Sequence, residues 1–135
     1  MQTAIPFLFM RGGSSRGPIF HSRNLPVDRD KLSEVLVAAL GSGHPLNIDG
    51  IGGGNSVTTK VAIISPSDDP WADIDYLFAQ VSVSDCLVDY GPTCGNMLTA
   101  VGPAAIEMGL IPALSKREEI KIRSLNTGAN FVVRV

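Results

Sequence analysis

Cys94 is the residue of this chain whose surroundings best suit chemistry. It follows Gly91-Pro92-Thr93 and stands just before an apolar stretch that is typical of a helix. At a helix start, a thiol faces free backbone N–H groups and the positive end of the helix dipole, and both favour the thiolate. Such a sulfur can take and return protons from carbon acids, and Gly95 would let a ligand carboxylate approach the backbone closely. The alternative is a buried, inert cysteine, which is the more common fate of a lone one.

Lys60 is the second candidate for chemistry. It lies in a predicted strand over residues 57–64, where alternation puts it on the same face as Ala62 and Ile64. A fully buried lysine is rare, and desolvation would favour the neutral amine, which could act as a base or an acid. The alternative is a lysine at the mouth of a strand, with its ammonium reaching water. Taken alone, the strand favours this second interpretation.

Two glycine-rich segments could bind an anion. Residues 11–17 offer arginine, two hydroxyls and many free N–H groups, which suit a carboxylate or a phosphate. This segment lacks the Gly-Lys-Ser/Thr ending of a P-loop. Residues 50–54 precede a strand rather than a helix, so they are not a dinucleotide-binding fingerprint. By itself, each segment is more often a tight turn than a ligand-binding loop.

The composition is that of one ordinary domain. The chain has 135 residues, of which 44% are hydrophobic, and 11 basic and 13 acidic side chains give a formal net charge of −2. This balance does not resemble a nucleic-acid-binding surface, and no apolar run approaches the roughly 20 residues that span a bilayer. The start of the chain lacks the pattern of a signal peptide. We therefore expect a soluble cytoplasmic protein with no nucleic-acid or membrane partner.

The remaining cysteine and the histidines suggest no further site. Cys86 has an apolar neighbour, Leu87, and no helix start beside it, so we interpret it as structural, and two cysteines do not make a disulfide framework. His21 and His44 lie at no metal-ligand spacing from another His, Cys or carboxylate. We therefore expect no metal.

The hydrophobic pattern predicts two helices. The first is capped by Asp28 and ends at Gly41. The second covers residues 96–108, is apolar almost all round, and should be buried and kinked at Gly102-Pro103 before it stops at Gly109.

The predicted strands and loops lie around these helices. Strands are expected over residues 5–10, 18–20, 57–64, 74–83, 119–125 and 130–135, with the last two forming a hairpin, and loops over 11–17 and 41–55. Because the chain ends inside a strand, we expect a fragment or a truncated form of a longer protein. Its exposed inter-domain face would be hydrophobic, so we also expect self-association into a homo-oligomer.

Five blocks in this order resemble one family, the PrpF-type isomerases. The blocks are Phe9-Met10-Arg11-Gly12-Gly13-Ser14-Ser15-Arg16-Gly17, Asp49-Gly50-Ile51-Gly52-Gly53, Thr59-Lys60-Val61-Ala62-Ile63, Tyr76-Leu77-Phe78-Ala79-Gln80-Val81, and Cys94-Gly95-Asn96-Met97-Leu98 with Ala100-Val101-Gly102-Pro103. The family includes 4-oxalomesaconate tautomerases, methylaconitate isomerases and methylitaconate isomerases. The nearest resemblance is to the tautomerase branch, from bacterial degradation of gallate and related aromatic acids. The chain departs from the family's first block by carrying Ser14 for Thr and Arg16 for Lys, which puts substrate choice in doubt more than chemistry.

The resemblance implies a fold and a reaction. The fold is α+β, of the diaminopimelate epimerase-like type, in which each of two domains wraps a mostly antiparallel sheet round a central helix, and residues 1–135 would be the N-terminal domain. The reaction is a cofactor-independent proton transfer on a small unsaturated polycarboxylate, with Lys60 and Cys94 as the acid/base pair. The order in which these two act stays open. The expected substrate-binding residues are Arg11, Gly13, Ser14, Ser15, Gly53, Gly95 and Asn96.

Overall fold

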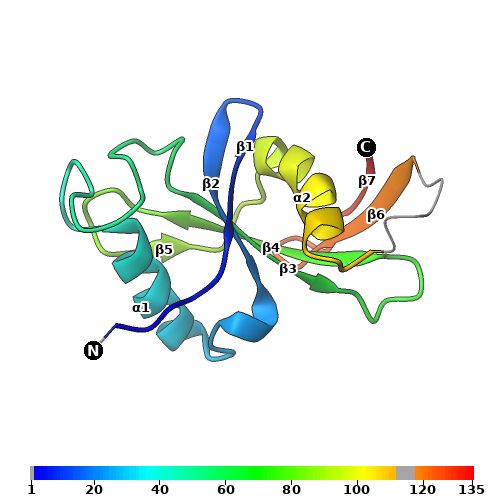
Figure 1. The fold of residues 1–135 in the computed structure, drawn as a ribbon, viewed down its shortest axis with the longest axis horizontal. Helices are drawn as coiled ribbons and strands as arrows, with labels where there is room; N and C mark the ends of the chain where they lie inside the picture. Colours follow the sequence, from blue (N-terminus) through cyan, green and yellow to red (C-terminus); the bar gives the residue numbers. More distant parts are fainter. Residues whose placement is uncertain (1, 112–117) are drawn as a thin grey trace.

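The fold is a seven-stranded sheet with one helix on each face (Figure 1). It is taken from a computed structural model that describes residues 2–111 and 118–135. Within these residues the strands are β1 (Leu8–Gly12), β2 (Ser15–His21), β3 (Lys60–Pro66), β4 (Ile74–Val81), β5 (Val88–Asp89), β6 (Glu119–Ser124) and β7 (Asn130–Arg134). The helices are α1 (Arg29–Leu40), α2 (Gly95–Glu107) and the short 3-10 helix η1 (Ser22–Asn24). In the described part of the chain, no helix is long and apolar enough to cross a membrane.

The sheet is mixed and curls round α2. Its order is β1-β2-β3-β4-β6-β7, with β5 paired to β4 beside this path. The pairs β2–β3 and β4–β6 are parallel, and the other pairs are antiparallel. Helix α2 contacts β1 at one edge of the sheet and β7 at the other, which requires the sheet to curve around it. The expected α+β arrangement of a mostly antiparallel sheet round a central helix is therefore present.

Both faces of the sheet are buried, each under its own helix. On the α2 face, Tyr76 and Phe78 of β4 join a cluster with Met97 and Val101 of the helix. On the opposite face, the alternate β4 residues Leu77, Ala79 and Val81 pack with the α1 leucines, Leu32, Leu36 and Leu40. A strand covered on both faces is apolar at almost every position, which explains why β4 reads as a nearly continuous hydrophobic run.

Helix α1 begins and ends as predicted. The Asp28 carboxylate accepts a hydrogen bond from the backbone N–H of Lys31 at 3.0 Å. Gly41 closes the helix in the left-handed region, at φ 76°, where glycine carries no steric penalty. The predicted cap at Asp28 and the predicted end at Gly41 are confirmed, and both are encoded by the residues at the helix ends themselves.

Helix α2 starts one residue earlier than predicted and is buried as expected. Its middle lies against the β6–β7 hairpin, because a Cβ on Gly102 would come within 3.2 Å of side-chain carbons of Val133 and Val135. Gly109 follows the helix at φ 71°, which confirms the predicted stop. Pro103 lies inside the helix, and the kink expected there stays a prediction.

The prediction of a loop over residues 11–17 is wrong. This segment forms the end of the β1–β2 hairpin, in which Gly12 pairs with Ser15 and Arg11 pairs with Arg16. Two of its glycines let other backbone segments approach closely. A Cβ on Gly12 would lie 2.1 Å from the Asn96 carbonyl oxygen, and a Cβ on Gly17 would lie 1.6 Å from the Lys60 carbonyl oxygen. These contacts join distant parts of the chain, so the local sequence gave no sign of them.

Strands β3 and β5 also differ from the sequence prediction. Strand β3 begins at Lys60 rather than at residue 57, because residues 52–58 turn back on themselves through hydrogen bonds from the Thr58 side chain to the Gly52 and Asn55 carbonyls. Strand β5 was not predicted. It is a two-residue strand that exists through its pairing with β4, and such a short segment carries no periodicity.

Candidate active site

The Cys94 thiol caps α2. Cys94 is extended, at φ −111° and ψ 113°, and its Sγ accepts a hydrogen bond from the backbone N–H of Met97 at 3.5 Å. The same sulfur lies 3.9 Å from the hydroxyl oxygen of Ser15 in β2. The residue is half-buried. The prediction of a thiol at a helix start, facing free backbone donors, is confirmed in its geometry.

The β1–β2 hairpin turn lies against this helix start. The Asn96 side-chain amide donates to the Ser14 hydroxyl at 2.9 Å. Gly13 has a φ of 55°, which favours glycine, and a Cβ there would lie 2.7 Å from the Asn96 side-chain oxygen, so the turn lies close to Asn96. A Cβ on Gly95 would meet nothing within 4 Å, so the first turn of α2 is open on that side. The structure therefore brings together five of the predicted substrate contacts: Gly13, Ser14, Ser15, Gly95 and Asn96.

Tyr76 of β4 holds the backbone of Cys94, and the sequence did not indicate this role. Its hydroxyl donates to the Cys94 carbonyl oxygen at 3.2 Å. Burial raises the pKa of Tyr76 well above its usual range, and the charge of Cys94 adds to this effect. Tyr76 is therefore a neutral donor that fixes the backbone of Cys94. A tyrosine in a strand buried on both faces needs a hydrogen-bond partner, and this was the available signal.

Asn126 holds the segment that leads to Cys94, and this residue was also missed. Strands β5 and β6 pair with different ends of the same β4 edge, which leaves Phe78 without a strand partner on that edge. The Asn126 side chain fills this gap. Its Oδ1 accepts from the Phe78 N–H at 2.7 Å, and its Nδ2 donates to the carbonyl oxygens of Phe78 and Tyr90 at 2.8 and 2.6 Å. Because Asn126 begins a turn, the sequence suggested only a turn former.

Lys60 is the first residue of β3 and is half-buried. Its Nζ donates to the side-chain oxygen of Gln80, the residue directly opposite on β4, at 2.5 Å. It also lies 5.7 Å from the centre of the Phe78 ring, which belongs to the α2 face. Ala62 belongs to that face as well, so the predicted side of the strand is confirmed.

Lys60 and Cys94 lie on the same face of the sheet. Ser15, which contacts the Cys94 sulfur, and Gly17, which abuts the Lys60 backbone, are two residues apart on β2. Two residues of a strand span about 7 Å. The Cys94 sulfur and the Lys60 backbone thus lie against neighbouring positions of β2, and the Lys60 side chain is on the α2 side of the sheet.

Arg11 and Gly53 are not brought to Cys94. Met10 packs towards α2, so by alternation Arg11 points to the opposite face of the hairpin. Arg16 lies on that face too, 5.6 Å from the centre of the Phe9 ring, and its NH2 would lie 3.1 Å from a Cβ on Gly53. The Arg16 Nε is buried without a hydrogen-bond partner. These side chains form a group separate from the Cys94 side of the hairpin.

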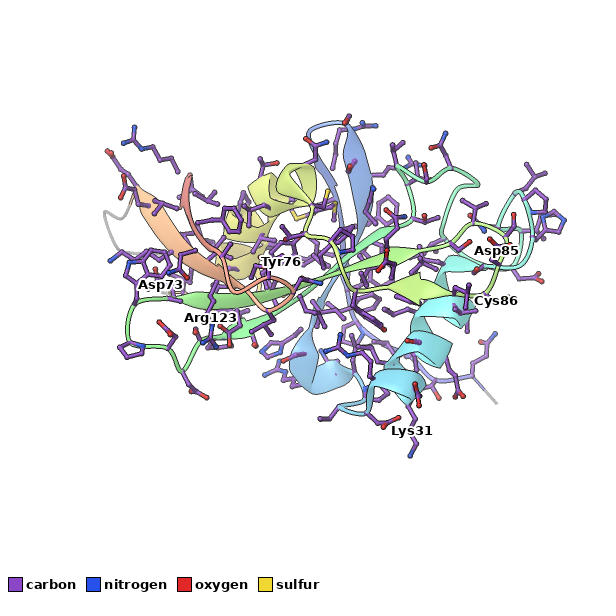
Figure 2. The ribbon with its side chains drawn as sticks, turned by 180° about the vertical axis from the view of Figure 1, so that it is seen from behind. Lys31, Asp73, Tyr76, Asp85, Cys86 and Arg123 are labelled. Atoms are coloured by element: carbon purple, nitrogen blue, oxygen red, sulfur yellow. The ribbon has the colours of Figure 1, made fainter. Side chains whose placement is uncertain are left out.

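Cys86 and the histidines lie elsewhere. Cys86 is exposed, and its thiol donates to the Ser42 carbonyl oxygen at 3.4 Å within a turn. Figure 2 places Cys86 near the end of α1, away from Tyr76 and α2. The Nδ1 atoms of His21 and His44 each accept a backbone N–H two residues ahead. Within residues 2–111 and 118–135, no group of three or more His, Cys, Asp or Glu side chains is placed to hold a metal ion.

Comparisons with known proteins match the whole described sequence to one protein family and to several named relatives. The family model described as "PrpF protein" matches residues 2–135. The chain is 56% identical over 124 residues to the protein of Escherichia coli (strain K12) named "Putative isomerase YbhH". This match covers 92% of the chain and 35% of YbhH. It is 48% identical over 134 residues to the 4-oxalomesaconate tautomerase of Pseudomonas putida, covering 99% of the chain and 37% of the tautomerase. This chain is thus more similar to YbhH than to the tautomerase. Sequence similarity alone therefore does not assign the chain to the tautomerase branch.

A solved structure has the same fold. The crystal structure of a methylitaconate-delta-isomerase superposes with a TM-score of 0.91 at 40% identity, over 97% of this chain and 34% of that one. The chain therefore spans about a third of the length of the relatives that it matches.

Proposed function

The chain belongs to the PrpF family, and from this premise we propose that it forms the N-terminal domain of a cofactor-independent isomerase. The reaction moves a proton between two positions of a small unsaturated tricarboxylate, and the domain belongs to a two-domain, diaminopimelate epimerase-like protein. Relatives named 4-oxalomesaconate tautomerase and 3-methylitaconate isomerase, at 48% and 41% identity, support this class of substrate. We take 4-oxalomesaconate as the first substrate to test, because the tautomerase matches 99% of the chain.

The observation that carries the proposal is the position of the Cys94 sulfur. It lies at the start of α2, in contact with Ser15, and on the same face of the sheet as Lys60. One of the two groups removes a proton from the carbon next to a carbonyl or carboxylate, and the electrons of the C–H bond pass into a dienolate. The other group delivers a proton to a different atom of the same substrate molecule, so the substrate is isomerised with no net change in its number of protons or electrons. Either order fits this arrangement.

The dienolate needs donors, and the α2 start supplies them. The first-turn N–H groups at Gly95 and Asn96 carry the positive end of the helix dipole. The hydroxyl of Ser15 and the side chain of Ser14 lie beside them. Preorganised donors of this kind stabilise developing negative charge more than water does. Arg11 points to the opposite face of the hairpin and Gly53 lies near Arg16 of that face, so we leave them out of the first contacts.

A second candidate function is a half-domain that binds an organic anion without turnover. It concerns residues 1–135 by themselves, which span 33–37% of the tautomerase and isomerase relatives. This alternative predicts no activity for residues 1–135 alone, and full catalysis by this polypeptide would reject it.

The test replaces the matching third of the Pseudomonas putida tautomerase with this chain and measures turnover of 4-oxalomesaconate. We expect the chimera to be active, and we expect Cys94→Ser or Lys60→Ala to lower turnover by about 100-fold or more, since each removes one proton-transfer group. The matched controls are Cys86→Ser and Lys31→Ala, because Figure 2 places both residues away from Tyr76 and α2. A folded but inactive chimera, or site variants as active as the controls, would contradict the proposal.

A further inference from the structure

The Lys60 side chain is tied to a neutral partner. Its Nζ donates to the Gln80 side-chain oxygen, and the two residues face each other across β3 and β4. Among the residues that the structure describes, no carboxylate forms an ion pair with this ammonium. A half-buried lysine is usually held by an acidic side chain or left in water. Lys60 differs from such lysines, because the neutral side-chain amide of Gln80 holds its ammonium.

The Gln80 amide has its orientation fixed by its other end. Its Nε2 lies within hydrogen-bond distance of three acceptors: the Thr59 hydroxyl oxygen at 3.1 Å, the Ser56 carbonyl at 3.2 Å and the Val81 carbonyl at 3.3 Å. Carbonyl oxygens only accept, so a flipped amide would place its oxygen against two of them. The amide oxygen must therefore face Lys60.

The Thr59 hydroxyl gives this chain of hydrogen bonds a single direction. Thr59 is fully buried, and its Oγ1 donates to the Val81 carbonyl oxygen at 2.7 Å. Its one proton is thereby used, so towards Gln80 the hydroxyl can only accept. The direction runs from Lys60 through Gln80 and Thr59 to Val81, and Gln80 can offer Lys60 only an acceptor.

An acceptor of this kind holds Lys60 in both protonation states. The ammonium has three N–H groups and the neutral amine has two, so one N–H can stay on the Gln80 oxygen while the nitrogen gains or loses a proton. With that N–H fixed, the lone pair of the amine must point elsewhere. A carboxylate in this place would instead stabilise the ammonium strongly and oppose loss of its proton.

We infer that Gln80 is the positioning residue for Lys60, holding its nitrogen at one point of the α2 face through a complete cycle of proton gain and loss. The anchoring stands on the hydrogen bonds alone. Its use in catalysis rests on the proposed function. Gln80 does not touch the reacting atoms in this account, and it acts only through Lys60.

The first test observes Lys60 directly in the 135-residue chain by NMR of the lysine Cε–Hε groups, with the Lys60 signal assigned by its loss in Lys60→Arg. A held side chain gives two distinct Hε shifts, and a free one gives an averaged signal. We expect two shifts in the wild type, and an averaged signal in Gln80→Met and in the shorter amide of Gln80→Asn. The Lys31 signal should be the same in all, since it reports an exposed position on α1. Separate Lys60 shifts in either folded variant would overturn the inference.

The second test uses the active chimera. Gln80→Met should lower kcat by about 10- to 100-fold with little change in KM, because a small displacement of a catalytic group affects the chemical step. Gln80→Glu should move the limb of the pH profile that reports Lys60 to higher pH, which a purely structural role would not do. Unchanged kcat in Gln80→Met would overturn the catalytic use of the anchor. An inactive wild-type chimera with the NMR result intact would refute the proposed function and leave the anchoring established.

Discussion

The two α-helices in the described part of this chain begin with different caps. Helix α1 begins at Asp28, whose carboxylate accepts from a backbone N–H at 3.0 Å. Helix α2 begins at Cys94, whose sulfur accepts at 3.5 Å. Asp is among the best N-cap residues, whereas a thiol is a weak acceptor. The difference indicates that position 28 serves helix stability and that position 94 gives up part of that stability for a sulfur atom.

The surroundings of the two caps differ in the same sense. The Asp28 side chain bonds within its own helix and is exposed. Cys94 is contacted by two distant residues, Ser15 of β2 and Tyr76 of β4. The segment that leads to it is held at Tyr90 by Asn126 of the β6–β7 turn. A residue whose role is local needs no such support. The support around Cys94 fits a group whose position must be exact for chemistry.

Exchanging the chemistry of the two caps should have the largest effect. Cys94→Ser places a good capping residue at α2, so we expect the free energy of unfolding to stay level or rise by a few tenths of a kcal/mol, while turnover of the chimera falls by about 100-fold or more. The mirror variant, Asp28→Cys, should lose stability and keep turnover. Both quantities are measured by urea denaturation of the chain and by steady-state kinetics of the chimera. Loss of turnover in Asp28→Cys but not in Cys94→Ser would reverse the comparison.

Removing the distant support of Cys94 should have the next largest effect. Asn126→Ala leaves the N–H and carbonyl of buried Phe78 without partners, so we expect a loss of about 2 kcal/mol or more. Tyr90, whose carbonyl Asn126 holds, also contacts the start of α1 through the Ser33 hydroxyl and the Arg29 guanidinium. Hydrogen exchange should therefore increase in the first turn of α2 more than in the last turn of α1, which lies away from these contacts. Asn130→Ala, an exposed asparagine at the start of β7, is the matched control. An equal increase in the first turn of α2 and the last turn of α1 would argue against a support that acts on the start of α2.

The Asp28 cap should have a moderate and purely local effect. Asp28→Ala removes the bond to the Lys31 N–H and should cost about 1 kcal/mol of unfolding free energy. Urea denaturation measures this loss, and Asp28→Asn, which keeps a capping oxygen, should retain most of the stability. A drop in chimera turnover in these variants would show that α1 is coupled to the site, against our account.

The smallest effect concerns pH. Burial, and to a lesser degree Arg23, lowers the pKa of His21, so the unfolded chain binds a proton at higher pH than the folded protein does. Stability should therefore decrease as pH falls below about 6.5, the ordinary value for histidine. Protonation also removes the Nδ1 acceptor for the Arg23 N–H. We expect a smaller loss between pH 7.5 and 5.5 in His21→Asn, measured by urea midpoints, and an identical loss would exclude His21 as the cause.

The sequence predicted what local signals encode. The Asp28 cap, the Gly41 and Gly109 stops and the apolar spacing placed both helices, and the position of Cys94 before α2 indicated its role as a helix-start thiol. The β6–β7 hairpin followed from its turn residues.

The remainder depends on pairing between distant strands. Gln80 faces Lys60 only because β3 and β4 pair in one register, and Asn126 matters only because β5 and β6 leave Phe78 open. The glycines of the β1–β2 hairpin suggested a loop, because nothing near them in the sequence shows that Asn96 and Lys60 lie against them. Such contacts are visible only once the chain is folded.

The most direct test of the central claim follows deuterium from D2O into 4-oxalomesaconate and its tautomer, using the chimera and NMR at each exchangeable position. We predict that the wild type exchanges at both ends of the proton transfer. Cys94→Ser and Lys60→Ala should each lose exchange at one end or at both, and the end that is lost identifies which group serves it. Exchange at wild-type rates at both ends in both variants would show that neither residue moves the proton, and would contradict the account.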